Sequence, residues 1–169
     1  MRHCGVIIIL LLLLMPLAAV AAQTTTFTRE SIEYELELPS AQWRAVQRLD
    51  VHDHFEFVYG ETESGYLRIS KNAVDAATSI TDLIHRDRRL KLRQLSGYVE
   101  CEEGPFGGNL QGRVLAYEYT SGGAQMAGRV YYLRVAERTA YTLHFTGERD
   151  KLRLIGDQID LIARSFRLK

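Results

Sequence analysis

The sequence predicts a domain of the α+β class, with an antiparallel sheet of six to seven strands and two helices packed on it. Most of the chain alternates apolar and polar residues with the period of a strand, and two segments change to a helical period. The connections between the last four strand segments are only a few residues long, which favours antiparallel pairing of neighbours.

The N-terminal segment, residues 1–22, has the pattern of a secretory signal peptide. A short polar start containing Arg2 precedes an unbroken aliphatic run at 6–14. Pro16 interrupts the apolar stretch, and small residues follow up to Ala22. We therefore expect cleavage after Ala22.

Cleavage there leaves residues 23–169 as a single exported domain, either periplasmic or secreted. The alternative is an uncleaved membrane anchor over residues 6–22, a stretch at the short edge of what spans a bilayer. Cys4 precedes the apolar run instead of closing it, so no lipid anchor is expected.

The first half of the mature chain predicts three strands. Residues 32–38 alternate apolar side chains with Glu, and Pro39 ends the pattern. A second alternation covers residues 51–59, the stretch 60–65 turns the chain, and residues 66–70 return as a third strand.

A helix is predicted over residues 73–94, with Asn72 as its N-cap and Asp75 as the capping partner. One face is apolar: Ala76, Ala77, Ile80, Leu83 and Ile84. Asp87 interrupts this face, so either the last turns leave the core or a neighbouring arginine pairs with it. Gly97 supplies the stop.

The C-terminal half predicts a four-stranded meander and a closing helix. The strand segments are 98–102, 112–119, 125–135 and 139–145. The helix covers residues 148–164 and places its apolar side chains on one stripe, so it is expected to seal one face of the sheet.

Several local strings resemble the PsbP-like superfamily. They are residues 34–39 with Trp43, the GRVYYL string at 128–133, YTLHF at 141–145 and IARSF at 162–166. The resemblance implies an α/β/α sandwich, and it implies an accessory or binding role instead of catalysis. The superfamily includes a nuclear transport factor and exported bacterial proteins to which no reaction is assigned. The exported bacterial branch fits this chain best, because a nuclear role conflicts with an export signal.

The charge balance argues against nucleic acid as a partner. The chain has 21 basic and 21 acidic residues, and the expected leader removes only one of the basic ones. A near-neutral domain offers no general attraction to a phosphate backbone. A charged partner would have to meet a local patch.

A candidate metal site is formed by His52, His54 and Glu56, which share one face of the predicted strand. Two imidazoles two residues apart can reach one divalent ion such as zinc or copper, with the carboxylate as third ligand. The alternative is a solvated strand face, since no fourth ligand is evident.

A candidate partner-binding cluster lies at the end of the first predicted helix and contains Arg86, Arg88, Arg89, Lys91 and Arg93. These cations can meet a phosphate-bearing lipid or an acidic partner surface. The alternative is a solvated face whose charge complements the negative end of the helix dipole.

Other residue types give no catalytic signature. Cys101, the only cysteine of the mature chain, follows the phase of Val99 and is expected in the core, with acidic neighbours that raise the pKa of its thiol. His144 has no acid or serine partner nearby in the sequence. The tyrosines of the last strands are expected mainly to pack in the sheet: Tyr117, Tyr119, Tyr131, Tyr132 and Tyr141.

These observations predict an exported, non-catalytic accessory or binding domain for an unknown protein or envelope component, without a cofactor. Two alternatives stay open. One is a divalent-metal-binding module, and the other is a hydrolase with a site assembled from distant residues, which a deep pocket enclosing a histidine and a nucleophile would favour.

Overall fold

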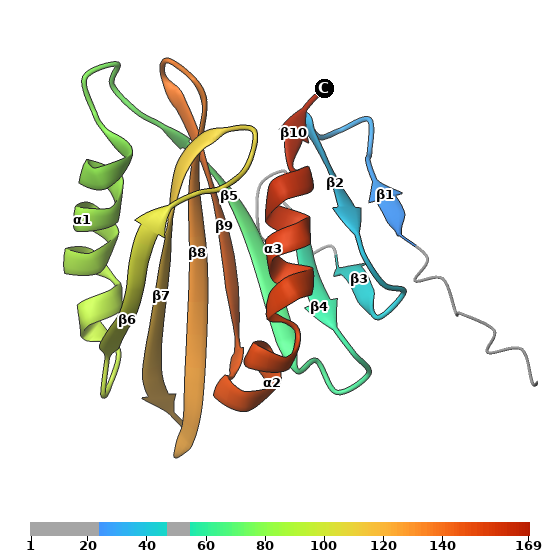
Figure 1. Ribbon diagram of the computed structural model, residues 1–169, viewed down its shortest axis with the longest axis vertical. Coiled ribbons are helices and arrows are strands. Elements are labelled where there is room, and N and C mark those ends of the chain that lie inside the picture. Colours follow the sequence, from blue (N-terminus) through green and yellow to red (C-terminus); the bar gives the residue numbers. More distant parts are fainter. Residues whose placement is uncertain (1–23, 47–54) are drawn as a thin grey trace, which may run out of the picture.

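Seven strands form one antiparallel sheet in the computed structural model, which describes residues 24–46 and 55–169. The order across the sheet is β3-β4-β5-β9-β8-β7-β6 (Figure 1). The strands are β3 (Trp43–Val46), β4 (Glu56–Tyr59), β5 (Gly65–Ala73), β6 (Val99–Pro105), β7 (Gln111–Ser121), β8 (Ala124–Ala136) and β9 (Thr139–Glu148). The fold is α+β, as the sequence predicts, and the C-terminal meander is confirmed.

A second, three-stranded sheet has the order β1-β2-β10. It consists of β1 (Thr25–Phe27), β2 (Tyr34–Leu38) and β10 (Arg167–Leu168). Figure 1 shows β10 at the C-terminus lying beside β2, so the first and the last strand of the described chain flank β2 on its two sides. The strands β1, β3 and β10 were not predicted, because each is too short to show an alternation of its own.

The sheet separates two apolar clusters, because successive side chains of a strand point to opposite faces. On β8, Val130 and Tyr132 belong to one cluster and Tyr131 and Leu133 to the other. The first cluster is covered by α1 (Ile80–Leu90), and the second by α2 (Arg149–Leu154), α3 (Gly156–Ser165) and the small sheet. The expected tyrosine packing is confirmed for the four that are buried, Tyr117, Tyr131, Tyr132 and Tyr141.

The predicted start of the first helix is wrong. Asn72 lies in β5, where it pairs with Ala140 of β9. The helix begins after Ser79, whose side chain accepts a hydrogen bond from the Asp82 backbone while the Asp82 carboxylate accepts one from the Ser79 backbone. Pairing with β9 therefore outweighs the capping potential of Asn72, and the same type of cap forms seven positions later. A 3-10 turn, η1 (Leu92–Gln94), follows α1.

The closing helix is interrupted where one helix was predicted. The backbone of Ile155 leaves the helical conformation between α2 and α3, directly before Gly156. The predicted apolar stripe is nevertheless buried, at Leu152, Ile155, Ile159, Ile162 and Ala163. Over residues 24–46 and 55–169, no helix has the length and apolar character needed to cross a membrane.

Candidate functional site

Helix α1 divides its basic residues between internal contacts and the outer surface. Ile80, Leu83 and Ile84 are buried against the sheet. Because the helix repeats every 3.6 residues, the opposite side is left to solvent, and Arg86 and Arg89 lie there one turn apart.

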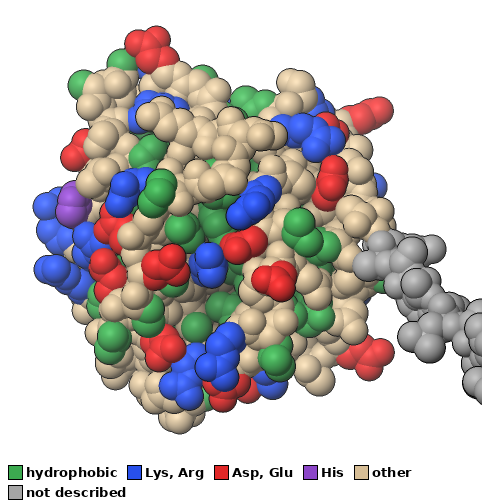
Figure 2. Space-filling view, viewed as in Figure 1, with side chains coloured by type: hydrophobic (Ala, Val, Ile, Leu, Met, Phe, Trp, Pro, Cys, Tyr) green, Lys and Arg blue, Asp and Glu red, His purple; other side chains and the backbone are tan. Residues whose placement is uncertain are grey.

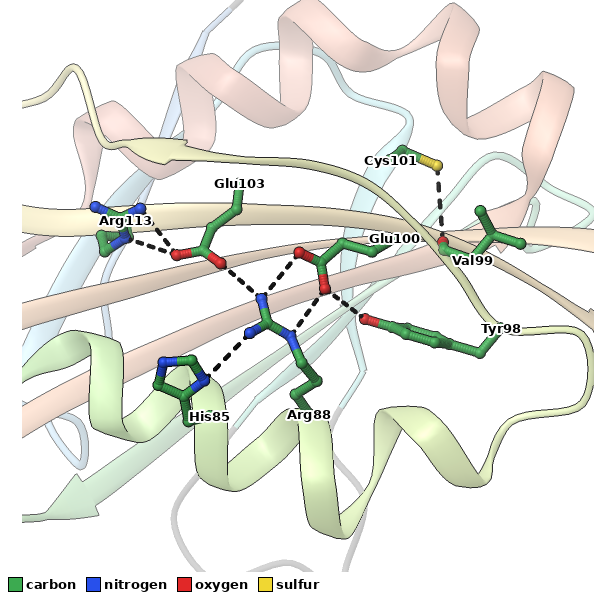
Figure 3. A network of polar contacts seen from close by, with 8 residues as sticks. All are labelled: His85, Arg88, Tyr98, Val99, Glu100, Cys101, Glu103 and Arg113. Atoms are coloured by element: carbon green, nitrogen blue, oxygen red, sulfur yellow. Dashed lines mark hydrogen bonds and ion pairs between the residues drawn. The ribbon is translucent and has the colours of Figure 1, made fainter.

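Arg88 is the internal cation, with only 13% of its side chain exposed. Its guanidinium pairs with Glu100 at 2.8 Å and with Glu103 at 2.6 Å, both on β6 (Figure 3). Glu103 also pairs with Arg113 of β7 at 2.8 Å. Although partial burial acts in the opposite direction, the hydrogen bonds from Arg88 and Arg113 hold the pKa of Glu103 below its usual value. This network fastens α1 to the edge of the sheet.

Lys91 is also used within the domain, because its ammonium lies 3.0 Å from the Asp87 carboxylate one turn earlier. The hydroxyl of Tyr132 donates a hydrogen bond to the other Asp87 oxygen at 3.4 Å. Of the two alternatives given for Asp87, the one in which an arginine pairs with it is wrong in the residue type, because a lysine does so.

The remaining three cations, Arg86, Arg89 and Arg93, form what we call the arginine face. All three are exposed, and within residues 24–46 and 55–169 no carboxylate forms an ion pair with them. Figure 2 shows basic side chains gathered beside a histidine at the edge of the molecule that α1 occupies. Leu90, 58% exposed, lies on the same helix. Three of the five residues predicted to bind a partner are thus exposed and make no ion pair with the described part of the chain, and their role in binding stays a prediction.

A groove lies next to α1 on the same face of the sheet. It has a volume of about 340 Å³. The side formed by η1, β7 and β8 is apolar and aromatic, with Leu92, Leu95, Tyr117, Tyr119, Val130 and Tyr132. The side formed by β5 and β9 is polar, with Arg68, Ser70, Asn72, Thr142, His144 and Thr146. A smaller hollow of about 190 Å³ continues it and shares Arg68, His144 and Thr146.

His144 and Tyr117 form a hydrogen-bonded pair at the floor of the groove, with 2.7 Å between the imidazole Nε2 and the phenol oxygen. Burial and the nearby Arg68 charge lower the pKa of His144 to about 4. Burial, with a smaller effect of neighbouring tyrosines, raises the pKa of Tyr117 above its ordinary value. Both side chains are therefore neutral at neutral pH.

This pair depends on Gly128 of β8, the strand between β7 and β9. Tyr117 pairs with Gly128 in the register, and its ring extends over that residue to reach β9. A Cβ added at Gly128 would lie 2.5 Å from Cε1 of Tyr117 and closer still to the phenol end. Only glycine leaves room for the ring to cross the strand.

The groove does not have the geometry of a hydrolase site. It encloses a histidine and hydroxyl groups, but His144 uses Nε2 for Tyr117 and has a pKa too low for an efficient base at neutral pH. The Thr142 hydroxyl accepts a hydrogen bond from Asn72 at 3.0 Å. In the described ranges no hydrogen bond joins His144 to a serine or threonine. The arrangement is suited to binding.

The predicted metal ligands are only partly described. Glu56 lies in β4, is 6% exposed, and forms an ion pair with Arg68 at 2.7 Å. His52 and His54 lie outside the described residues. Among residues that are described, no group of three or more His, Cys, Asp and Glu side chains is placed to hold a metal ion. The metal site therefore stays a prediction.

Cys101 is exposed, so the prediction that it lies in the core is wrong. Val99, whose phase Cys101 was predicted to share, is itself 59% exposed, because β6 is the edge strand of the sheet and is exposed along most of its length. A β-bulge between Glu100 and Glu102 also leaves Cys101 without a partner in β7. Burial of the thiol and the charge of Glu118 raise the pKa of Cys101, in the direction expected from its acidic surroundings.

The pairing of His144 with Tyr117 was not predicted from the sequence. One signal was available: a glycine inside a strand pattern, here Gly128, indicates a close approach of another group. The identity of that group depends on the register of three strands, which the local sequence does not provide.

Comparison with known proteins gives a structural match without a sequence match. No family model matches the sequence, and no curated protein is significantly similar to it. The cyanobacterial PsbP of Synechocystis, CyanoP, is 13% identical with a TM-score of 0.65, over 99% of this chain and 98% of that one. The Ran-binding protein Mog1p of Saccharomyces cerevisiae is 8% identical with a TM-score of 0.64, over 87% of this chain and 96% of its own.

The chain has a PsbP/Mog1-like fold. LpqN of Mycobacterium tuberculosis, a protein involved in cell envelope biogenesis, has the same fold at 15% identity and a TM-score of 0.57, over 87% of this chain and 91% of that one. The resemblance inferred from the sequence strings is thereby confirmed at the level of the fold. Identities this low carry over no function.

Proposed function

We propose that this chain is an exported, non-catalytic binding domain that docks through its arginine face on an acidic surface of a partner protein. The observation that carries the proposal is the division of cations on α1 and η1. Arg88 and Lys91 are paired internally, whereas Arg86, Arg89 and Arg93 are exposed without an ion pair in the part of the chain that the structure describes.

Physical chemistry favours a binding role for such a face. Like charges held close together repel one another, and a complementary acidic surface relieves that repulsion and accelerates association. The exposed Leu90 adds apolar area next to the charges. A binding role is compatible with the fold, since Mog1p, a structure of the same fold, is described as a Ran-binding protein.

The export part of the proposal rests on the leader pattern of residues 1–22, and it is compatible with the similarity to LpqN, which is involved in cell envelope biogenesis. We expect a C-terminally tagged chain to leave the cytoplasm and to begin at Gln23 when its mass is measured. A tagged product that keeps residues 1–22 and stays in the membrane would support the anchor alternative instead.

The docking part is tested with a triple variant, Arg86→Glu, Arg89→Glu and Arg93→Glu. A charge-matched control reverses exposed arginines elsewhere, at Arg138 and Arg153 with Arg29. Proteins cross-linked to the wild-type chain in the native envelope are identified by mass spectrometry and then purified for binding measurements.

We expect the association rate with the purified partner to fall at least about tenfold in the arginine-face variant, and to fall with rising salt in the wild type. The control triple should bind like the wild type. Equal losses in both triples would show a general charge effect and refute a specific face. If the chain bound phosphatidylglycerol vesicles and no protein, the arginine face would dock on a membrane surface and the proposal of a protein partner would be wrong.

The metal alternative is kept because the described residues do not test it. We expect a zinc or copper titration of the purified chain to show saturable binding that is lost in the variant His52→Ala and His54→Ala. Unchanged binding in that variant would eliminate the site.

A further inference from the structure

The groove beside α1 is separate from the arginine face and has the size of a small-ligand site. Its volume of about 340 Å³ corresponds to roughly ten water molecules at about 30 Å³ each. This lies at the lower end of the range for small-molecule pockets. The groove therefore suits a ligand of one or two rings.

The charges around the groove already cancel. Arg68 pairs with Glu56 at 2.7 Å, and Lys91 pairs with Asp87 at 3.0 Å. An ionic ligand would have to separate one of these pairs before it gained a partner, whereas a neutral ligand leaves both intact. The imidazole of His144 is itself uncharged at neutral pH.

The polar side of the groove offers donors and acceptors in alternation. The amide of Asn72 donates to Thr142, which leaves its own carbonyl oxygen as an acceptor. Ser70 and Thr146 contribute hydroxyl groups that both donate and accept. A ligand that carries several hydroxyls can satisfy such a mixed surface, whereas a purely accepting or purely donating ligand leaves part of it unpaired.

The opposite side offers apolar contact. Leu92 and Leu95 of the η1 segment and the ring of Tyr119 line it. The strand order β5-β9-β8-β7 places this side across the groove from the polar one. A ring with hydroxyls along one edge and C–H groups on its faces can contact both sides at once.

We propose that this groove binds one uncharged saccharide unit, with its hydroxyl edge toward Asn72, His144 and Thr146 and a C–H face against Leu92, Leu95 and Tyr119. The ligand class follows from the neutral charge balance, the mixed donors and acceptors and the apolar opposite side. A nucleoside shares the ring and the hydroxyls but exposes a flat aromatic base, for which the groove has tyrosines on one side only.

The test is an NMR titration of amide chemical shifts in the purified, isotope-labelled chain. The probes are N-acetylglucosamine, its β-linked dimer, glucuronate and uridine. For the neutral sugars we expect saturable shifts at β5 and β9 around Asn72 and His144, with dissociation constants on the order of 1 mM. Tighter binding of the dimer than of the monomer would indicate that the natural ligand is the end of a glycan chain. Equal binding of the two would indicate a free sugar.

Variants test the polar side without disturbing the core. Ser70→Ala and Thr146→Val together remove two hydroxyls that line the groove, and we expect them to weaken sugar binding about tenfold. The control for the threonine change is Thr81→Val, which removes one hydroxyl from the exposed surface of α1 and should bind like the wild type.

Three results would overturn the proposal. They are preferential binding of glucuronate or uridine, shifts that cluster away from the groove, and no saturable shift with either neutral sugar. Because the arginine-face variant leaves the groove residues unchanged, loss of partner docking and loss of sugar binding are separately measurable.

Discussion

Replacing Gly128 by alanine should destabilise the domain more than an ordinary strand substitution. The added Cβ would lie 2.5 Å from Cε1 of Tyr117 and closer to the end of the ring, whereas real Cβ contacts below 3.0 Å essentially do not occur. The ring cannot simply swing away, because Tyr117 is only 2% exposed and packs against Tyr98 and Tyr119.

Two costs add at this position. Overpacking of a filled site costs about 1–3 kcal/mol. Displacement of the ring also breaks the 2.7 Å hydrogen bond between Tyr117 and His144, which contributes about 1 kcal/mol. We therefore expect Gly128→Ala to lower the free energy of unfolding by about 2–4 kcal/mol, measured by urea denaturation.

The same substitution in a variant that lacks the Tyr117 ring tests whether that ring causes the loss of stability. In Tyr117→Leu the shorter side chain no longer covers Gly128, so Gly128→Ala should be neutral or should stabilise by up to about 1 kcal/mol, as expected for alanine over glycine in a strand. Gly104→Ala is the matched control, since a Cβ there meets nothing within 4 Å. An equal cost of Gly128→Ala in both backgrounds would refute the steric argument.

Three further predictions concern the neighbouring groups. Folding lowers the pKa of His144 from 6.5 to about 4, so the unfolded state binds more protons between these two pH values. The contribution of His144 to the free energy of unfolding should therefore be complete above about pH 6.5 and fall by about 2–3 kcal/mol as the pH drops to about 4. The variant His144→Gln should lack this pH dependence, which is measured as the difference between the urea-denaturation results of the two proteins across this pH range. Replacing Arg88 by glutamine leaves Glu103 without its shortest ion pair and should cost about 2–3 kcal/mol, whereas the exposed Arg89→Gln should change the midpoint of thermal unfolding little. Cys101 should react with a thiol reagent in the native protein, more slowly than a free cysteine because its pKa is raised; reaction only after unfolding would place it in the core after all.

Prediction from the sequence succeeds where the structural signal is local. The strands of the C-terminal meander show their own alternation and are joined by tight turns, so both their existence and their antiparallel pairing could be predicted. The helix start failed because two N-cap patterns compete, one at Asn72 and one at Ser79. The choice is made by β9, which pairs with β5 as far as Ala73 and holds Asn72 in an extended conformation.

In the candidate sites, too, the local features can be predicted from the sequence and the long-range contacts cannot. The basic cluster is visible in the sequence, but the separation of Arg88 from Arg89 depends on Glu100 and Glu103, which reach the helix only after β6 takes its place at the sheet edge. Likewise, the phase shared by Val99 and Cys101 was expected to face the core, but the place of β6 at the edge of the sheet leaves both side chains exposed. Long-range pairing is the information that a local pattern lacks.

The distribution of the core explains why both candidate surfaces lie on the α1 side. The larger apolar cluster lies on the other face, where α2, α3 and the small sheet cover it and residues such as Phe145 and Leu143 are fully buried. On the α1 side the apolar cluster is smaller and centres on β7 and β8, while β9 presents Thr142 and His144 to the groove. Substitutions of exposed residues on this face therefore remove few apolar contacts and cost little stability, whereas changes at its buried or partly buried groups, such as Gly128 and Arg88, are costly. The α1 face therefore carries both the arginine face and the groove, while the opposite face holds the larger part of the apolar core.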